Sequence, residues 1–296
     1  MPRLVWLNGN ITPLENATTS VADHAHLYGD GLFEGIRIYD GRVFKLDEHL
    51  ARLYHGCRYL GYAMTMGVDE LKRTLLDVCR QSEIADGYIR LNVTRGTGLG
   101  LDPKNIDQTP NVMILVSSLA LYPKEAYETG LKVVTTSLRV IPPDVLDPRV
   151  KCIGRYASNI LAKAEANRAG AGEGLMLNAQ GQIAECTGDN IFLVRGERIL
   201  TPHSASGILE GITRNTVMEL AKEAGYTVEE AFLTPFDVYV ADEAFLTGTA
   251  AEVIPMISLD TRPIGDGQPG PVTRDLMARF RAHTAEGTPF LEGVLA

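Results

Sequence analysis

The sequence predicts an α+β protein built as two domains. Its 296 residues are 45% hydrophobic and 22% charged, a balance typical of a globular enzyme that is long enough for two cores. Strand-like and helix-like segments mix along the chain without a steady βαβ rhythm, which favours α+β. We expect a small N-terminal domain over residues 1–118, an inter-domain connection over 119–131 around Pro123, and a larger C-terminal domain over 132–296.

The N-terminal domain is expected to begin with strands. Short apolar runs predict them at residues 4–7, 32–39 and 42–46, and the Asp40-Gly41 turn joins the last two into a hairpin. A helix follows, with four apolar residues on one face: Leu46, Leu50, Leu53 and Cys57. A second helix at about 69–81 and paired strands at 88–94 and 112–117 complete this domain.

The C-terminal domain continues the mixture of strands and helices. Strands are expected at 131–136, 243–247 and 253–257, together with a strand pair near 174–177 and 191–194. Apolar periodicity predicts helices at 158–168, 212–224 and 271–281.

Composition narrows the class of function. A net charge of -9 and a pI near 5.2 argue against nucleic-acid binding, which needs a basic face. The four cysteines lack CxxC spacing and the first residues form no apolar signal segment, so we expect a cytoplasmic protein without a transmembrane helix. His24 and His26 have no third ligand at metal-binding spacing, so we expect no metal site.

Lys151 is the leading candidate for a catalytic residue. Val150, Cys152 and Ile153 surround it, and an apolar setting makes a lysine amine more nucleophilic by lowering its pKa. Taken alone, Lys151 is better explained as an ordinary solvated surface lysine. With the groups described next, it suggests a Schiff base to pyridoxal phosphate.

Three further segments supply what such a cofactor needs. Glu185, between two strand-like runs, could pair with the pyridine nitrogen and strengthen the electron sink, or be a solvated turn residue. Gly211-Ile212-Thr213 opens a helix whose N-terminal N–H groups could bind phosphate, although a simple capped helix has the same pattern. The Thr247-Gly248-Thr249-Ala250 turn lets a backbone approach a ligand closely.

Six segments in this order resemble the class IV aminotransferases, and most of all the branched-chain-amino-acid aminotransferases. They span nearly the whole chain: residues 28–37, 48–53, 151–156, 185–192, 211–214 and 247–253. The resemblance implies the fold type IV of pyridoxal-phosphate enzymes, with two α+β domains, the cofactor at their interface, and a homodimer or larger assembly of dimers.

The resemblance also implies roles for individual residues. Lys151 would form the Schiff base and move the substrate proton, Glu185 would face the pyridine nitrogen, and Tyr156 would bind the phenolic oxygen. Residues that would hold the phosphate or pack on the ring are Arg52, Leu209, Ile212, Thr213 and Thr249. Residues that would bind the substrate α-carboxylate are Tyr88, Thr249 and Ala250. Residues that would form the side-chain pocket are Tyr28, Phe33, Gly35, Arg37, Arg90 and Tyr122, the last from the partner subunit.

The implied reaction transfers an amino group between leucine, isoleucine or valine and 2-oxoglutarate, as in branched-chain amino-acid biosynthesis. Strand alternation places Tyr88 and Arg90 on one face, where an arginine fork could take the glutamate carboxylate. Arg155 and Glu210 depart from the family pattern, which leaves other enzymes of this fold open: D-amino-acid or amine transaminases and aminodeoxychorismate lyases. Outside this class, a cofactor-free Schiff-base lyase or a non-catalytic binding protein is the alternative.

Overall fold

The computed structural model of the chain describes residues 4–107, 109–118 and 121–291, which form two compact units. Unit 1 contains the described residues of Met1–Leu119, Val150–Arg155 and Thr284–Ala296, and unit 2 those of Ala120–Arg149 and Tyr156–His283. The segment with Lys151 therefore groups with unit 1, whereas the sequence suggested the C-terminal domain. Residues 119 and 120 of the expected connection lie outside the described residues, and helix α4 (Lys124–Thr129) fills much of the remainder.

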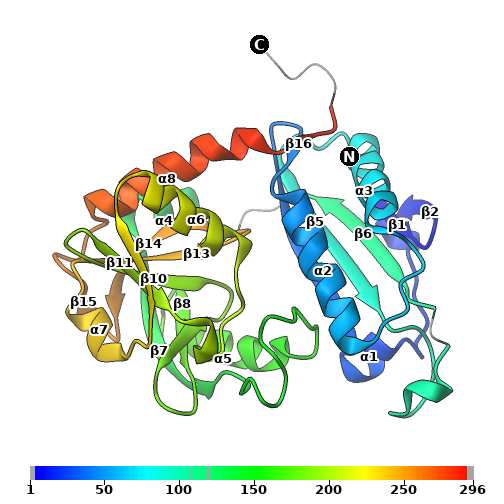
Figure 1. Cartoon of the computed structure of the whole chain (residues 1–296), viewed down its shortest axis with the longest axis horizontal. Coiled ribbons are helices and arrows are strands. Elements are labelled where there is room, and N and C mark those ends of the chain that lie inside the picture. Colours follow the sequence, from blue (N-terminus) through cyan, green and yellow to red (C-terminus); the bar gives the residue numbers. More distant parts are fainter. Residues whose placement is uncertain (1–3, 108, 119–120, 292–296) are drawn as a thin grey trace. The chain divides into compact units, whose positions relative to one another are not determined.

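Unit 1 is one antiparallel sheet with helices packed against it (Figure 1). Its strands are β1 (Leu4–Leu7), β2 (Asn10–Pro13), β3 (Gly31–Tyr39), β4 (Arg42–Val43), β5 (Gly87–Thr94), β6 (Val112–Ser117) and β16 (Thr288–Pro289). Its helices are α1 (His24–Tyr28), α2 (Leu46–Leu60) and α3 (Val68–Ser82), with 3-10 turns at Leu14–Asn16, Pro103–Asn105 and Thr284–Glu286. Among the described residues the strand order is β16-β4-β3-β5-β6-β1-β2.

The two faces of this sheet differ because side chains alternate along each strand. In β5, Ile89, Leu91 and Val93 are fully buried, whereas Tyr88 and Arg90 on the other face are only partly buried. Helices α2 and α3 contact β3, β6 and β1 and cover the apolar face. The expected hairpin is confirmed by the pairing of β3 with β4, and the expected pairing of 88–94 with 112–117 is confirmed by β5 and β6.

Helix α2 confirms the predicted apolar stripe. Leu46, Leu50, Leu53 and Cys57 are all buried against the sheet, as helical spacing requires for residues on one face. Because α2 already starts at Leu46, β4 is only two residues long instead of the five expected.

Unit 2 is a larger mixed sheet with helices around it (Figure 1). Its strands are β7 (Leu131–Arg139), β8 (Glu173–Leu177), β9 (Ile183–Cys186), β10 (Asn190–Arg195), β11 (Arg198–Pro202), β12 (Thr227–Ala231), β13 (Glu243–Gly248), β14 (Glu252–Leu259) and β15 (Arg262–Pro263). Besides α4, its helices are α5 (Tyr156–Arg168), α6 (Ile212–Glu223), α7 (Pro235–Tyr239) and α8 (Pro271–His283), with a 3-10 turn at Ser204–Ser206.

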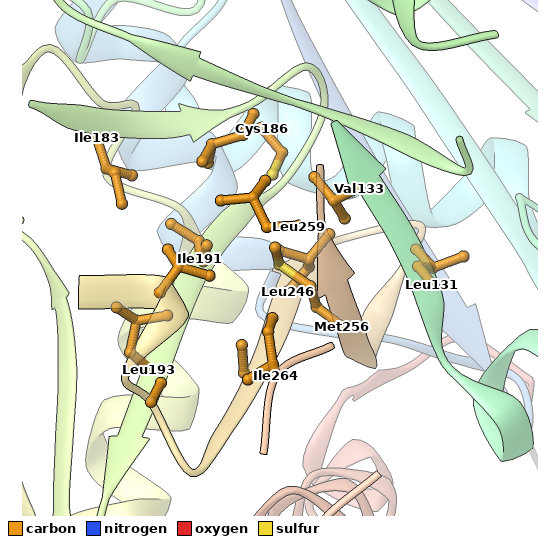
Figure 2. Packing of buried hydrophobic residues seen from close by; sticks show 14 of the residues in the cluster. Leu131, Val133, Ile183, Cys186, Ile191, Leu193, Leu246, Met256, Leu259 and Ile264 are labelled. Atoms are coloured by element: carbon orange, nitrogen blue, oxygen red, sulfur yellow. The ribbon is translucent and has the colours of Figure 1, made fainter. Parts of the chain in front are cut away.

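Its strand order within the described chain is β12-β11-β10-β13-β14-β7-β8-β9, with β15 beside β14. Strand β9 also contacts β10 and β11, so the sheet curls around an apolar core. Figure 2 shows this core, in which Ile191, Leu246 and Leu259 come from three different strands. The expected pairing of 174–177 with 191–194 is wrong: β8 pairs with β7 and β9, while β10 pairs with β11 and β13.

In the part of the chain that the structure describes, none of the helices combines the length and the apolar character that spanning a membrane requires.

Candidate active site

The segment that carries Lys151 is bound by its backbone to strand β3. The Phe33 N–H donates to the Lys151 carbonyl over 3.1 Å, and the Ile153 N–H donates to the Gly31 carbonyl over 2.7 Å. Lys151 itself forms the first of these bonds and the residue two positions later forms the second, so together they fix the backbone from which the Lys151 side chain extends.

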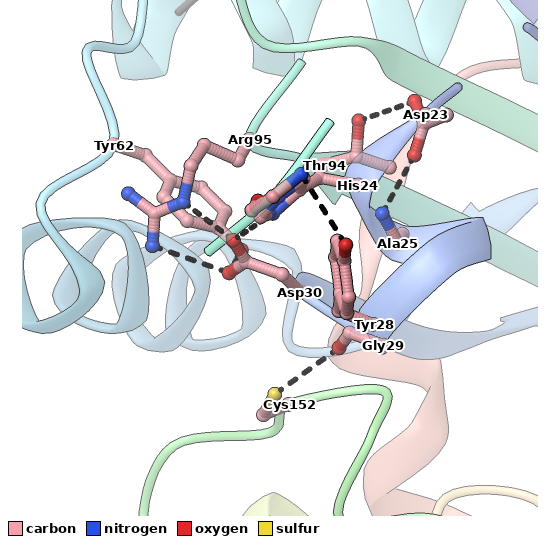
Figure 3. Close-up of polar contacts among 11 residues, drawn as sticks. Asp23, His24, Ala25, Tyr28, Gly29, Asp30, Tyr62, Thr94, Arg95 and Cys152 are labelled. Carbon is pink, nitrogen blue, oxygen red and sulfur yellow. Dashed lines mark hydrogen bonds and ion pairs between the residues drawn. The ribbon is translucent and has the colours of Figure 1, made fainter. Parts of the chain in front are cut away.

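The turn before β3 is fitted tightly against the same segment. Gly29 ends α1 in a left-handed conformation (φ 70°), and its carbonyl accepts a hydrogen bond from the Gly154 N–H over 3.0 Å. The Cys152 thiol lies 3.5 Å from the same carbonyl oxygen, as Figure 3 shows. A Cβ at Gly29 would stand 2.6 Å from the Gly154 Cα, which leaves no room for a side chain there.

Two cations lie against the ring of Phe33. The Lys151 Nζ is 4.5 Å from the ring centroid, and the Arg90 Cζ is 3.5 Å from it. The negative face of an aromatic ring stabilises cations at such distances. Phe33 therefore contacts both the candidate catalytic amine and the candidate carboxylate-binding arginine.

The predicted side-chain pocket coincides with one face of the β3–β5 pair. Gly35 is opposite Arg90, and Arg37 is opposite Tyr88, with the register that alternation requires. A Cβ at Gly35 would stand 2.1 Å from the Tyr88 hydroxyl oxygen, so only glycine allows Tyr88 to lie flat across β3. The structure thus brings together five predicted residues: Phe33, Gly35, Arg37, Tyr88 and Arg90.

Tyr28 lies at the end of α1 rather than on this sheet. The residue is 47% exposed, and its hydroxyl accepts a hydrogen bond from the Gly100 N–H over 3.3 Å. The glycine-rich segment that contains Gly100 is followed by the 3-10 turn at Pro103–Asn105 instead of the long helix of a dinucleotide-binding loop.

The predicted phosphate ligand Arg52 is held by a buried carboxylate on the other face of β3. The Glu34 side chain is fully buried and accepts hydrogen bonds from Arg52 Nε (2.8 Å), Arg52 Nη2 (2.7 Å) and His49 Nδ1 (2.7 Å). Burial would raise the pKa of Glu34, but the charge and hydrogen bonds of Arg52 and the bond from His49 lower it to about 2. Burial lowers the pKa of His49, which favours its neutral form.

A second, partly buried acid anchors the turn that contacts the Lys151 segment (Figure 3). Asp30 accepts hydrogen bonds from Arg95 Nε (2.5 Å), Tyr62 (2.8 Å) and His24 Nδ1 (2.7 Å). Burial opposes the charged form, but the bonds from Arg95, His24 and Tyr62 outweigh it and lower the pKa of Asp30. The turn at residues 28–31 is therefore fixed by charge on one side and by backbone bonds on the other.

In unit 2, Glu185 lies on the inner part of strand β9. It is 6% exposed, and its Oε2 accepts a hydrogen bond from the Leu209 N–H over 2.8 Å. Asn190 Nδ2 donates to the Leu209 carbonyl over 2.9 Å. Glu185 is thus a buried strand residue, and the alternative of a solvated turn residue is wrong.

Helix α6 starts directly after Leu209 and Glu210. Its N-cap Gly211 provides no side-chain cap, and a Cβ there would stand 2.1 Å from the Asn190 Oδ1. Ile212 and Thr213, the first helical residues, are both buried. The structure therefore places Glu185, Leu209 and this helix start in one cluster, linked through Asn190.

The turn between β13 and β14 carries the predicted residues Thr249 and Ala250, both partly buried. A Cβ at Gly248 would stand 2.2 Å from the Asp189 Oδ1, so the Asp189 carboxylate packs closely against the backbone of this turn.

Tyr122 is engaged within its own unit. Its hydroxyl lies 3.1 Å from both Glu173 Oε2 and Asp189 Oδ2. Burial and the charge of Glu173 raise the pKa of Asp189 to about 7. The single hydroxyl proton of Tyr122 is shared by these two acids, so the ring is the part of Tyr122 that could serve a substrate pocket.

The remaining predicted residues follow Lys151 directly. Tyr156 is the first residue of α5 and is partly buried, and Arg155 before it is 3% exposed.

The sequence analysis missed the residues that hold the predicted ones. Glu34 and Asp30 carry a signal that could have revealed them, because a carboxylate in or beside a buried strand needs a cation. Asn190 and Asn92 carry no such signal, since a neutral amide is unremarkable in any strand.

Comparison with known families identifies the chain as a class IV aminotransferase. A family model described as "Amino-transferase class IV" matches residues 31–259, and the chain belongs to this family.

Individual relatives support the same conclusion over almost the full length. The chain is 43% identical over 278 residues to a protein of Methanocaldococcus jannaschii, covering 94% of this chain and 95% of the relative. It is 35% identical over 281 residues to the branched-chain-amino-acid aminotransferase of Escherichia coli strain K12, covering 93% and 91%. Its structure is similar to the crystal structure of a branched-chain amino acid aminotransferase with pyridoxamine 5'-phosphate, with a TM-score of 0.91, 36% identity and coverage of 100% and 98%.

Proposed function

We propose that this protein is a pyridoxal-phosphate-dependent aminotransferase that moves the amino group between a branched-chain L-amino acid and 2-oxoglutarate. The observation that carries the proposal is the setting of Lys151, whose backbone is clamped by β3 and whose Nζ lies on the Phe33 ring. Proteins named as branched-chain-amino-acid aminotransferases match 93% and 100% of this chain, which supports the proposal. We further propose a cytoplasmic homodimer or a larger assembly of dimers.

The described residues fit this cofactor. Glu185 is a buried carboxylate suited to the protonated pyridine nitrogen, and the α6 start offers N–H donors without a side-chain cap. The hydroxyl oxygen of Thr247, opposite Asn190 in the sheet, is buried and has no hydrogen-bond partner among the described residues. A polar ligand beside this cluster would supply the hydrogen bond that the Thr247 hydroxyl lacks among the described residues.

Each side chain then has a task in the proposed reaction. When bound, pyridoxal phosphate supplies an electron sink for the negative charge that develops at the substrate Cα. Lys151 would anchor the cofactor covalently and would move the proton at that Cα, for which an amine is suited. The phosphate would be held by Arg52, Ile212, Thr213 and Thr249. Leu209 would pack on the ring, and Tyr156 would bind the phenolic oxygen.

The substrate would be bound by two further groups of residues. Tyr88, Thr249 and Ala250 hold the α-carboxylate. The side-chain pocket would be formed by Tyr28, Phe33, Gly35, Arg37 and Arg90, together with the ring of Tyr122 from the partner subunit. Apolar surface from Phe33 accepts a branched chain, and Arg90 accepts the second carboxylate of glutamate.

Borohydride reduction tests the covalent role. Protein supplied with pyridoxal phosphate should carry a pyridoxyl adduct on Lys151 by mass spectrometry, and Lys151→Ala should lose both the adduct and transamination. Lys132→Ala is the matched control, because Lys132 is exposed on β7. An adduct missing from the cofactor-supplied wild type would overturn the proposal.

An amino-donor panel tests the substrate. L-leucine, L-isoleucine and L-valine should each react with 2-oxoglutarate. Activity with D-alanine or a simple amine in place of these three would reject the branched-chain assignment and leave the cofactor chemistry standing.

A further inference from the structure

Arg90 is held in one orientation by its own sheet, and the residue that holds it is Asn92. The Arg90 Nε donates to the Asn92 Oδ1 over 2.8 Å, while the guanidinium lies on the Phe33 ring. We propose that Asn92 is a positioning residue that gives the site its affinity for dicarboxylate substrates by aiming Arg90. The inference rests on the proposed function, in which Arg90 binds the second carboxylate.

The geometry leaves one edge of the guanidinium for a ligand. An arginine can bind a carboxylate in two-pronged fashion either through Nε and one Nη or through the two Nη atoms. The bond to Asn92 occupies Nε, and Phe33 covers one face of the plane. Nε is the one side-chain nitrogen of Arg90 with a hydrogen-bond partner among the described residues, which leaves the Nη1–Nη2 edge to receive a carboxylate.

The strand itself explains why Asn92 can reach Arg90. The two residues are separated by one position in β5 and therefore share the partly buried face. Asn92 is paired with Phe33 across the sheet, so ring and amide approach the guanidinium from neighbouring positions. Rotation of the Arg90 fork away from this edge would break the hydrogen bond or the ring contact.

The chemistry of an amide suits this task. An aspartate at position 92 would also accept from Nε, but its charge would neutralise Arg90 and repel a substrate carboxylate. A leucine would fill similar space and leave Nε without its acceptor. Asparagine alone among these three fixes the guanidinium and keeps its full positive charge for the ligand.

The two classes of substrate should therefore depend on Asn92 to different extents. Glutamate and 2-oxoglutarate have a second carboxylate for the Nη edge. The side chains of leucine, isoleucine and valine have no group that forms hydrogen bonds, and they contact Phe33 and Gly35 whichever way the fork points. Loss of Asn92 should therefore weaken the binding of dicarboxylate substrates more than the binding of branched-chain substrates.

The test compares Asn92→Leu and Asn92→Asp with the wild-type holoenzyme. We expect the KM for glutamate to rise about tenfold relative to the KM for leucine in Asn92→Leu, and further in Asn92→Asp, with kcat for leucine changing little. Calorimetric binding of glutarate and of 4-methylvalerate gives a readout that does not depend on turnover. Glutarate binding should weaken by a similar factor relative to 4-methylvalerate binding.

Met113→Leu is the matched control, because Met113 is paired with Asn92 on β6 and has the same partial burial. It should leave the glutamate-to-leucine ratio unchanged. Equal changes for both substrates in the Asn92 variants, or no change, would overturn the inference while leaving a functioning transaminase. A wild-type protein without transamination would instead overturn the proposed function.

Discussion

The fully buried carboxylate of Glu34 accepts hydrogen bonds from both Nε and Nη2 of Arg52, at 2.8 and 2.7 Å, and the Arg52 side chain is 14% exposed. The pair joins strand β3 to helix α2. Because the two bonds fix the plane of the guanidinium, Glu34 determines how Arg52 can meet a phosphate.

Glu34→Gln should destabilise the protein and weaken its affinity for pyridoxal phosphate. Removing one partner of a buried ion pair leaves an uncompensated charge, which costs about 3 kcal/mol of unfolding free energy. Urea denaturation at pH 7 measures the loss, and titration with pyridoxal phosphate measures the affinity. Glu48→Gln on the same helix is the control, because the Glu48 side chain is 50% exposed and its pair with Lys45 should contribute less than about 1 kcal/mol.

The same carboxylate predicts how stability depends on acid. The folded-state pKa of Glu34 is lowered to about 2 from its ordinary value of 4.5, so its contribution is full above pH 4.5. It declines as the pH falls toward 2, because the unfolded state gains a proton that the folded state resists. The stability gap between wild type and Glu34→Gln should narrow over this range, and a gap that is constant from pH 5 to 2.5 would contradict the assignment.

Gly29→Ala should be more harmful than Gly61→Ala, although both glycines end a helix with φ 70°. Left-handed backbone alone costs alanine about 1 kcal/mol at each position. At Gly61 the new Cβ would meet nothing within 4 Å, whereas at Gly29 it would stand 2.6 Å from the Gly154 Cα. We expect an additional loss of about 1–3 kcal/mol in Gly29→Ala. Denaturant midpoints of the two variants test the difference. Equal midpoints would show that the backbone at Gly154 can move away from a new Cβ at position 29 without a loss of stability.

Asp30→Asn should loosen the turn that supports the Lys151 segment. The amide keeps the shape but loses the charge that Arg95 and His24 share, a loss of about 1–2 kcal/mol at this partly buried site. Because the pKa of Asp30 is lowered in the folded state, this contribution is present at neutral pH and fades as the pH falls below about 4. Urea denaturation at pH 7 and pH 3.5 checks both points.

Asp77→Asn is the control for Asp30, since the Asp77 side chain is 60% exposed in its pair with Arg80. A loss in Asp30→Asn no larger than in this control would argue against an anchoring role.

In the wild type, the free energy of unfolding should decrease as the pH rises through 7, and Asp189→Asn should remove this decrease. Burial and the charge of Glu173 raise the folded-state pKa of Asp189 to about 7, above the unfolded value of 3.8. Such a group favours the folded state below pH 3.8, and its contribution is lost as the pH rises through 7. The wild type should lose more unfolding free energy than Asp189→Asn between pH 5 and pH 8. Asp144→Asn, at an exposed position, should follow the wild-type curve.

The sequence was sufficient to predict elements whose pattern is local. Helix α2 was found from its leucine stripe and β5 from its alternation, because each has a single apolar face. Strand β9 was missed because Glu185 interrupts its apolar run, and the false pairing of β8 with β10 followed from that omission. The parallel pairing of β7 with β14 depends on contacts more than a hundred residues apart, which no local pattern records.

In the candidate site, too, contacts between residues far apart in the sequence could not be predicted. Resemblance identified Phe33, Arg90 and Arg52, but not the residues that hold them. The contacts of Glu34 with Arg52 and of Asp30 with Arg95 cross 18 and 65 positions of sequence, and pairing of this kind is fixed only when the elements have packed. Asn92 was invisible because its importance lies in one hydrogen bond rather than in its residue type.

The composition of unit 1 has a consequence for the growing polypeptide. Strand β16, which pairs with β4, and the Lys151 segment, which pairs with β3, both belong to a unit whose other strands precede residue 118. On the ribosome, the sheet that emerges first must wait for residues 150–155 and then for Thr288–Pro289 before its contacts are complete. The part of the chain that is synthesised first is therefore the last to be completed, and Lys151 can reach its place only after synthesis has passed well beyond that sheet.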